Sequence, residues 1–272
     1  MEVVIIGSGS VATHLGLALK EKGIVIKQVF SRNPTNAEVL AKKLETSFIT
    51  DISDIYMDAE IYFYALKDNA LKSILRKMDM PAGIHVHTGG TIPMSEFEGF
   101  VTRFGVFYPL QTFSVDKPVD FSKIPICIEA SNLEIQKKLV ELSLLLTENY
   151  YLIDSEHRKK LHLAAVFACN FTNYMYDIAS EILIDAGMSF DIIKPLILET
   201  AQKVDYMSPY DAQTGPALRM DTRTIARHLR LMEGKNDFKK IYKALTKYIH
   251  NRHTKEKKKT KLNTLMSYMT KR

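Results

Sequence analysis

The feature that most constrains this chain is a glycine-rich segment directly after the first β-rich run. Residues 3–6 lead into Gly7-Ser8-Gly9-Ser10-Val11-Ala12, where an amphipathic helical pattern begins. This is G-x-G-x-x-A between a strand and a helix, the arrangement in which backbone N–H groups at a helix start hold a diphosphate. Gly7 permits the tight turn, Gly9 the close approach of phosphates, and Ala12 the packing of helix on strand. We expect a dinucleotide site here; the competing interpretation is a purely structural turn.

Short β-rich runs alternate with helical patterns through the first part of the chain. The runs cover residues 3–6, 25–30, 48–49, 61–65, 84–87, 105–108, 126–129 and 150–153. Such alternation favours a parallel sheet covered by helices. The sequence therefore predicts the α/β class, with a Rossmann-type, doubly wound, mostly parallel sheet over residues 1–153.

The β-rich runs stop after residue 153. The remaining chain shows helical spacing over roughly 155–186, 189–206, 222–233 and 237–251. We predict a smaller all-helical domain over residues 154–251, followed by a basic C-terminal tail over 252–272.

The formal charge of +6 belongs to this tail. Residues 252–272 hold eight Lys or Arg and one Glu, which leaves 29 basic and 30 acidic residues elsewhere. A lysine-rich terminus can contact RNA or anionic lipid, but the lack of interleaved aromatic residues favours a solvated end. We therefore find no strong signal for a nucleic-acid or membrane partner, and binding of RNA or a membrane surface through the tail stays an alternative that rests on charge alone.

Composition and cysteine usage fit an ordinary cytoplasmic protein. Apolar residues make up 46% of the chain, and no apolar run reaches the roughly 18–20 residues of a membrane span. No basic leader precedes the first strand. Cys127 and Cys169 both lie in apolar surroundings, which favours reduced cysteines over a disulfide or a metal site. The predicted location is the cytoplasm, and no metal is expected.

The end of the second strand indicates which dinucleotide binds. An acidic residue there would accept from the ribose hydroxyl of NAD, but this strand ends in Phe30-Ser31-Arg32-Asn33. Arg32 and Ser31 can instead bind a 2′-phosphate, so NADP is the predicted cofactor. The alternative is that Arg32 is a surface loop residue.

Polar or flexible segments follow three later strands. In an open α/β sheet, ligands bind outside the carboxyl ends of the strands. Each segment alone is explained by ordinary turn chemistry, but three at one edge favour a pocket. We expect cofactor contacts at Ala65, Leu66, Lys67, Thr88 and Gly89, and a substrate contact at Gln111.

The long helical pattern after residue 155 carries one polar line. His162, Asn170, Asn173 and Asp177 fall within an arc of about 80° at helical spacing. The other positions are apolar, which predicts a helix buried nearly all round except along this line; they are Leu163, Phe167, Phe171, Tyr174, Met175 and Ile178. The polar line either pairs with a neighbouring helix or faces a wet cleft. His162 is a candidate proton donor, although a hydrogen-bonded core histidine is an equal alternative.

A Pro- and Gly-containing loop later in the helical half leads to a candidate anion clamp. Gln213-Thr214-Gly215-Pro216-Ala217 precedes Arg219 and Asp221, and Asp221 is placed to cap the next helix. Arg219 can bind a substrate carboxylate or phosphate, or pair with Asp221.

These residues together resemble a known family. The matching segments are Gly7 to Ala12, Phe30 to Asn33, Phe107-Tyr108-Pro109-Leu110-Gln111-Thr112-Phe113-Ser114, His162 to Asn173, and Ala212 to Ala217 with Arg219 and Asp221. Over residues 1 to about 250, they resemble the Rossmann-like, DUF2520-containing proteins, predicted short-subunit NADP-dependent oxidoreductases. More distantly, the layout is similar to the 6-phosphogluconate, 3-hydroxyisobutyrate, ketopantoate and pyrroline-5-carboxylate reductase group. That wider resemblance implies a homodimer formed through the helical domain.

One departure from the wider group affects the mechanism. Its hydroxyacid members place a catalytic Lys four residues before an Asn on the first long helix of the second domain. If Asn170 matches that Asn, the Lys position holds Val166, which cannot transfer a proton. The proton donor is then His162, or lies on the side of Thr88 and Gln111, or no hydride transfer occurs.

We therefore weigh two functions. The first is an NADP-dependent oxidoreductase acting on a small polar carbonyl, imine or hydroxyl compound in a cleft between the two domains. Its predicted catalytic residues are His162 as acid or base with Asn170 and Gln111 orienting the substrate, and its predicted substrate contacts are Asn173 and Arg219. The alternative is an NADP-binding sensor that contacts a partner protein and transfers no hydride.

Overall fold

The computed structural model describes residues 1–114 and 117–269, with side chains described as far as Lys255. The chain forms two compact units, Met1–Thr172 and Asn173–Arg272, which are described separately below. Among the described residues, no helix is both long enough and apolar enough to cross a membrane.

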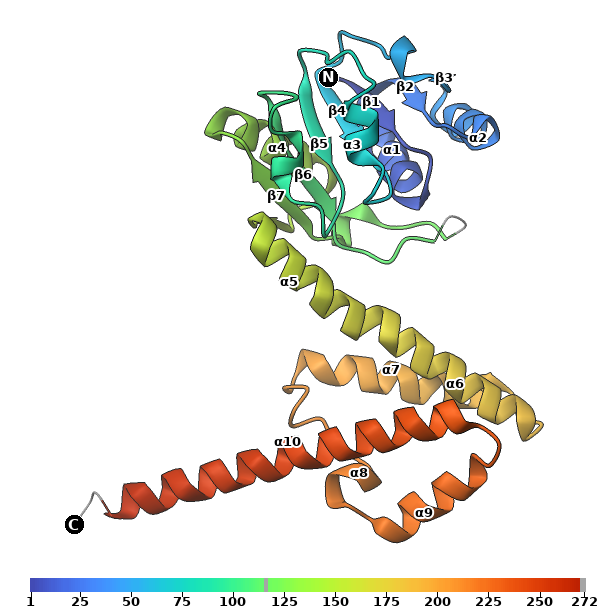
Figure 1. The fold of residues 1–272 in the computed structure, drawn as a ribbon, viewed down its shortest axis with the longest axis vertical. Helices are drawn as coiled ribbons and strands as arrows, with labels where there is room; N and C mark the ends of the chain where they lie inside the picture. The colour runs from blue at the N-terminus through green and yellow to red at the C-terminus, as the bar shows by residue number, and fades with distance from the viewer. Residues whose placement is uncertain (115–116, 270–272) are drawn as a thin grey trace. The chain divides into compact units, whose positions relative to one another are not determined.

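The first unit is built on an eight-stranded sheet in the order β3-β2-β1-β4-β5-β6-β7-β8 (Figure 1). The strands are β1 (Glu2–Ile6), β2 (Val25–Phe30), β3 (Ser47–Ile49), β4 (Ile61–Tyr64), β5 (Ile84–His87), β6 (Phe104–Pro109), β7 (Ile126–Ala130) and β8 (Tyr150–Leu152). All neighbours pair in parallel except β6 and β7, which are antiparallel. The predicted doubly wound, mostly parallel sheet is confirmed. Strand order reverses beside β1, which is where such sheets bind ligands.

Both faces of the sheet are covered, and β1 shows why its sequence is apolar throughout. Val3 and Ile5 belong to the core formed with α1 (Ser10–Glu21), α2 (Pro34–Leu44) and α4 (Leu133–Leu146). Val4 and Ile6 belong to the opposite core, with α3 (Leu71–Leu75) and the 3₁₀ turn η2 (Met94–Phe97). A central strand buried on both faces reads as a continuous apolar run. Two further 3₁₀ turns are η1 (Ile52–Asp54) and η3 (Phe121–Lys123).

Helical structure is continuous from Ser155 to Asp185. It comprises α5 (Ser155–Ala165), the π-helical segment η4 (Val166–Phe171) and α6 (Thr172–Asp185). The compact units divide at Thr172, within this helical stretch, whereas the predicted domain boundary at residue 153 marks the change in composition and stays a prediction. The difference has a physical cause, because the first turns of α5 are tied to the sheet by the fully buried Arg158.

The second unit is helical, as expected. After α6 it contains η5 (Phe190–Ile193), α7 (Lys194–Gln202), η6 (Lys203–Asp205), α8 (Pro216–Arg219), α9 (Thr222–Leu231) and α10 (Asn236–Met269). The last helix was expected to end near residue 251, but it continues through the lysine-rich segment. That segment contains no Gly or Pro, and lysine is a good helix former. The side chains after Lys255 lie outside the described part, so the role of the basic tail stays a prediction.

The second unit leaves most of its apolar side chains exposed. Within its described residues only Met232, Thr246 and His253 are buried. The large apolar side chains of Ile184, Ile192, Leu196 and Leu231 are between 65% and 83% exposed.

The long helix itself departs from the predicted burial. Its apolar positions were expected to be covered nearly all round, yet four aromatic and aliphatic side chains, Leu163, Phe167, Phe171 and Tyr174, are 46–62% exposed. Asn170, Asn173 and Asp177, on the predicted polar line, are exposed as well. An apolar pattern predicts that a surface is to be covered, but not by which chain.

Candidate dinucleotide-binding site

The turn after β1 requires glycine at its first position. Gly7 has φ +129°, and its N–H donates to the Phe30 carbonyl at 2.8 Å. A Cβ at this position would overlap the backbone carbonyl of Ala65 after β4. Gly7 therefore lets the ends of β1, β2 and β4 lie close together.

Gly9 has a different environment. It is the N-cap of α1 with φ −82°, and a Cβ added there would meet no protein atom within 4 Å. No side chain caps this helix start, and its first turn holds no acidic residue. The open N–H groups and the positive end of the helix dipole therefore face open space suited to an anion. Ala12 lies below the turn, fully buried against the sheet, so it supports the turn by packing.

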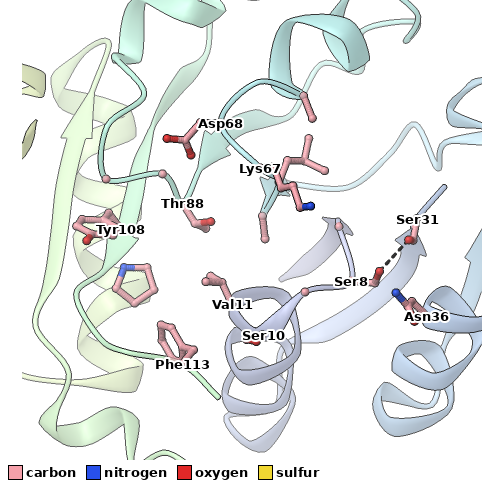
Figure 2. A pocket seen from close by; sticks show the side chains of 18 of the residues that line it. Ser8, Ser10, Val11, Ser31, Asn36, Lys67, Asp68, Thr88, Tyr108 and Phe113 are labelled. Atoms are coloured by element: carbon pink, nitrogen blue, oxygen red, sulfur yellow. Dashed lines mark hydrogen bonds between the residues drawn. The ribbon is translucent and has the colours of Figure 1, made fainter. Parts of the chain in front are cut away.

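A second polar group lies at the end of β2. The Ser8 hydroxyl donates to the Ser31 hydroxyl at 2.7 Å, which joins the two turns (Figure 2). Asn33 caps α2 by accepting from the N–H of Asn36 at 3.0 Å. Arg32 lies between these residues with its side chain exposed. This arrangement offers hydroxyl, amide and guanidinium donors within one short segment.

These turns line a cleft of about 680 Å³ at the carboxyl edge of the sheet (Figure 2). That volume is within the range of small-molecule and cofactor sites. The cleft brings together most of the predicted residues, namely Gly7, Ser8, Gly9, Ser10, Val11, Ser31, Arg32, Ala65, Leu66, Lys67, Thr88, Gly89, Gln111 and His162. Among the described lining residues, Arg32 and Lys67 carry permanent positive charge, and Asp68 is the one carboxylate.

Four predicted residues are not part of this lining. Ala12 is buried in the core beside β1. Asn170 is exposed on the π-helical segment. Asn173 and Arg219 are exposed residues of the second unit. Asp221 caps α9 as predicted, and the described residues show no ion pair between it and Arg219. The Thr224 backbone N–H donates to Asp221, which lowers the pKa of its carboxyl.

Nine lining residues were not predicted individually, and they are Phe30, Asn33, Asn36, Asp68, Ala70, Gly90, Tyr108, Pro109 and Phe113. Tyr108 and Phe113 flank the predicted Gln111 within one segment, and Gly90 directly follows Gly89. Asn36 lies three residues after the cap Asn33, hence one helical turn away on the same side of α2. The sequence signal that could have found these residues is that each lies close to a predicted residue along the chain.

His162 enters the cleft from α5 and packs tightly there. Its Nδ1 lies 3.1 Å from the Tyr108 hydroxyl oxygen. A Cβ added at Gly90 would lie 2.6 Å from His162 Nδ1 and 3.0 Å from Tyr108 Cζ. The backbone of the loop after β5 therefore lies so close to the imidazole that there is no room for a side chain at position 90.

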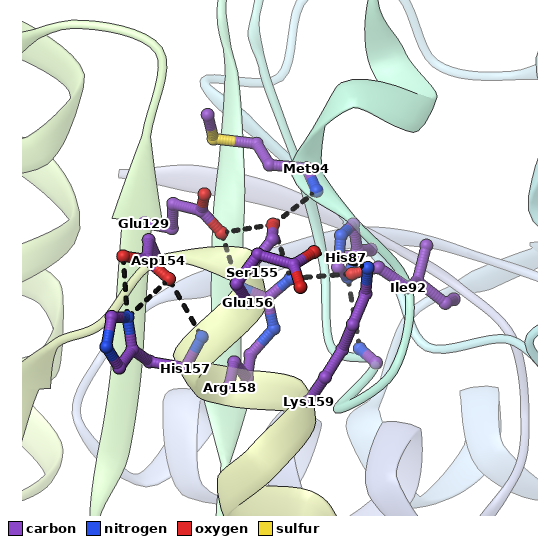
Figure 3. A network of polar contacts seen from close by, with 11 residues as sticks. His87, Ile92, Met94, Glu129, Asp154, Ser155, Glu156, His157, Arg158 and Lys159 are labelled. Carbon is purple, nitrogen blue, oxygen red and sulfur yellow. Dashed lines mark hydrogen bonds and ion pairs between the residues drawn. The ribbon is translucent and has the colours of Figure 1, made fainter.

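A buried ion pair between Arg158 and Glu129 holds α5 in this position (Figure 3). Arg158 lies one helical turn before His162. Arg158 is fully buried and pairs with Glu129 on β7, and it also donates to the Ile92 carbonyl at 2.6 Å. The Ser155 hydroxyl donates to Glu129 at 2.7 Å and accepts from the Met94 N–H at 2.9 Å. The network thus ties α5 to both β7 and the loop after β5.

His87, at the end of β5, supports the same loop from below. Its Nδ1 accepts from the Gly89 N–H at 3.2 Å. Burial, together with the nearby charge of Arg158, lowers the pKa of His87 to about 3, so this imidazole is neutral.

The described residues contain no cluster of side chains suited to a metal ion. Cys127 is buried, and burial raises the pKa of its thiol to about 11, whereas Cys169 is exposed; both are free. Cysteine therefore contributes no reactive group to the cleft.

A doubly wound sheet with a glycine turn and a cleft at its switch point defines a dinucleotide-binding protein of the Rossmann class. Two family descriptions match the chain: "NADP oxidoreductase coenzyme F420-dependent" over residues 2–86 and "Domain of unknown function (DUF2520)" over residues 124–249. The crystal structure of a "putative NADP oxidoreductase" from Bacteroides fragilis is 44% identical with a TM-score of 0.87, covering 92% of this chain and 98% of that one. The chain belongs to the DUF2520-containing family of Rossmann-type NADP oxidoreductases. The predicted family is confirmed, and so is NADP as the cofactor of that family.

More distant structures share the fold. An imine reductase from Myxococcus stipitatus in complex with NADP⁺ is 15% identical with a TM-score of 0.68, covering 92% of this chain and 93% of that chain. A 1-pyrroline-5-carboxylate reductase from Streptococcus pyogenes is 12% identical with a TM-score of 0.64, covering 93% and 98%. Comparison with curated proteins finds no match.

Proposed function

We propose that this chain binds NADP(H) in the cleft and transfers hydride between the nicotinamide and a small polar carbonyl, imine or hydroxyl compound. The observation that carries the proposal is the uncapped start of α1 at Gly9, open to a cleft whose other wall holds Ser31 and Arg32. A phosphate fits at the start of α1, and a second phosphate fits beside Ser31 and Arg32. Family membership favours an enzyme over the alternative of a sensor without hydride transfer.

The residues present fit the proposed cofactor. Backbone N–H groups of residues 8–11 would hold the diphosphate. Ser31, Arg32 and Asn36 would bind the 2′-phosphate, because each offers a donor to the cleft. Ala65, Leu66, Lys67, Thr88 and Gly89 would contact the remainder of the dinucleotide.

The bound cofactor would supply the hydride, and the chain would supply orientation and the polar groups around the reacting carbon. His162 is the proposed acid or base, since it is the imidazole that lines the cleft. Gln111 would orient the substrate from the β6 side. Val166 cannot replace the lysine of the hydroxyacid enzymes. Asn170, Asn173 and Arg219 stay predictions as substrate contacts.

Calorimetric titration with NADPH and NADH tests the cofactor proposal. Gly9→Val should fold normally, since no protein atom is near its Cβ, and should bind neither dinucleotide. Arg32→Ala should weaken NADPH binding by about 1.5–3 kcal/mol, the range for hydrogen bonds to charged groups, with little effect on NADH. Lys42→Ala on α2 removes a nearby charge outside the cleft lining and serves as control. Equal losses of NADPH and NADH binding in Arg32→Ala would contradict the 2′-phosphate assignment.

Turnover is tested by loss of NADPH absorbance across a panel of keto acids, aldehydes and cyclic and acyclic imines. Imines belong in the panel because proteins of the same fold are imine and pyrroline-5-carboxylate reductases. Tight NADPH binding without turnover of any compound would count against the enzymatic proposal.

We also propose that the chain is a homodimer joined through its helical unit, in the cytoplasm. The support is the exposure of apolar side chains such as Ile192, Leu196 and Leu231 in that unit. Large exposed apolar side chains of this kind are characteristic of an interface between chains. Light scattering coupled to size-exclusion chromatography tests it, and a monomeric mass at micromolar concentration would contradict it.

A further inference from the structure

Three tyrosine–histidine pairs in the described residues share one type of contact, a tyrosine hydroxyl against histidine Nδ1. Tyr64 with His85 and Tyr242 with His228 each have this distance at 2.8 Å, and neither pair lines the cleft. In the third pair, Tyr108 and His162 are 3.1 Å apart and both line the cleft. Of the three pairs, Tyr108 and His162 are therefore the one pair in which the tautomer of the histidine can affect a ligand in the cleft.

The imidazole of His162 is held from two directions. Arg158, one helical turn earlier, fixes the position of α5 through Glu129 and the Ile92 carbonyl. The backbone at Gly90 leaves no room for a Cβ beside His162 Nδ1. The ring therefore has little freedom to turn away from Tyr108.

The hydroxyl of Tyr108 is a proton donor at neutral pH. Burial raises its pKa to about 12, so the phenol stays protonated. Within the described residues, His162 Nδ1 is the hydrogen-bond partner of this hydroxyl. A phenol is a good hydrogen-bond donor and a poor acceptor, whereas an unprotonated imidazole nitrogen is a strong acceptor, so this contact is favoured when Tyr108 donates to Nδ1.

We propose that Tyr108 is a positioning residue that holds neutral His162 in the tautomer with its proton on Nε2. The Nε2 atom has no hydrogen-bond partner among the described residues, so its N–H is free to donate to a ligand in the cleft. The catalytic consequence rests on the proposed function. Nε2–H would donate to the oxygen of a carbonyl, or the lone pair of a neutral imine, where negative charge grows as hydride reaches the carbon.

Nitrogen NMR of ¹⁵N-histidine-labelled full-length protein at pH 8.5 tests the tautomer directly, because the signal of each ring nitrogen differs between its protonated and unprotonated forms. The signals of His162 are assigned by their loss in His162→Gln. We expect a protonated Nε2 and an unprotonated Nδ1 in the wild type. In Tyr108→Phe, which keeps the ring but loses the hydroxyl, both signals should move toward values of mixed tautomers.

Tyr242→Phe is the matched control, since it removes the same kind of hydrogen bond from His228. It should shift the His228 signals and leave those of His162 unchanged. A wild-type His162 with its proton on Nδ1, or unchanged His162 signals in Tyr108→Phe, would overturn the proposal.

Kinetics adds the functional readout. Tyr108→Phe should lower kcat by about 3- to 10-fold, the effect of one neutral hydrogen bond, with the Kd for NADPH changed less than twofold. Tyr242→Phe should leave both values unchanged. If the wild type turns over no substrate, the proposed function fails, yet the NMR result still decides the tautomer. Unchanged kcat in an active Tyr108→Phe protein would overturn the catalytic consequence.

Discussion

The two units of this chain differ in how they bury apolar surface. In the Rossmann unit, β1 is buried on both faces, and alternate residues belong to two separate cores within the same chain. In the helical unit, Met232 is the one buried apolar residue in the described part, and it is 7% exposed. The first unit therefore closes its own core, whereas the second leaves apolar side chains exposed, which supports the proposed homodimer. Each prediction below tests this difference by mutation.

The largest effect should come from charging the apolar surface of the helical unit. Ile192→Asp with Leu196→Asp should weaken dimer association by at least about 100-fold, since each buried aliphatic side chain contributes about 1.5–3 kcal/mol. Mass by light scattering over a dilution series measures it. The control places aspartate at Leu133 and Leu144 on α4, which are 72% and 51% exposed on the Rossmann unit. Dissociation by the α4 variant instead would break the comparison.

The next effect concerns the ion pair that ties α5 to the sheet. Arg158→Met should lower the free energy of unfolding by about 3–5 kcal/mol, because it leaves the Glu129 carboxylate without its partner. Arg103→Met removes the exposed pair with Glu134 and should cost about 0–1 kcal/mol. Urea denaturation followed by circular dichroism measures both. Similar losses would show that Arg158 is not an anchor.

The Rossmann unit could be predicted because its signals are local and repeated. All eight strands were expected from β-rich runs, and the switch-point rule then placed segments such as 65–67 and 88–89 at one cleft. The same reasoning missed what depends on tertiary contacts. Arg158 stands in a charged run that reads as solvated, yet its side chain is fully buried. Tyr108 could be placed at a strand end, but its pairing with His162, 54 residues later, has no local signature.

The helical unit shows where prediction from helical spacing fails. Its helices were expected from their spacing, but the prediction that the long helix is buried nearly all round was wrong for the single chain. Helical periodicity predicts that one face of a helix is covered. It does not predict whether the covering surface belongs to the same chain or to another chain. The change in composition at residue 153 also differs from the division of the compact units at Thr172, because the first turns of α5 pack against the sheet.

A smaller effect separates the two glycines of the turn within the Rossmann unit. Gly7→Ala should destabilise the protein by about 1–3 kcal/mol, because its φ is +129° and a Cβ overlaps the Ala65 carbonyl. Gly9→Ala should leave stability within about 0.5 kcal/mol, since its backbone is ordinary and its surroundings are open. Thermal unfolding compares the two. A destabilised Gly9→Ala would mean that the space beside Gly9 is needed by the fold.

Per pH unit, the smallest predicted effect is a pH dependence of stability that belongs to the closed core. Burial lowers the pKa of His87 to about 3, whereas in the unfolded chain it is near 6.5. Between these values the unfolded state binds the extra proton, so stability falls as pH decreases from 6.5 toward 3, by up to about 1.4 kcal/mol per pH unit. His87→Asn should flatten that slope while retaining an acceptor for the Gly89 N–H. Urea unfolding at pH 4, 5 and 6 measures the slope for both proteins. Parallel wild-type and variant curves would show that His87 can take a proton in the folded state, so that the loop beneath the cleft is less closed than the rest of the Rossmann core.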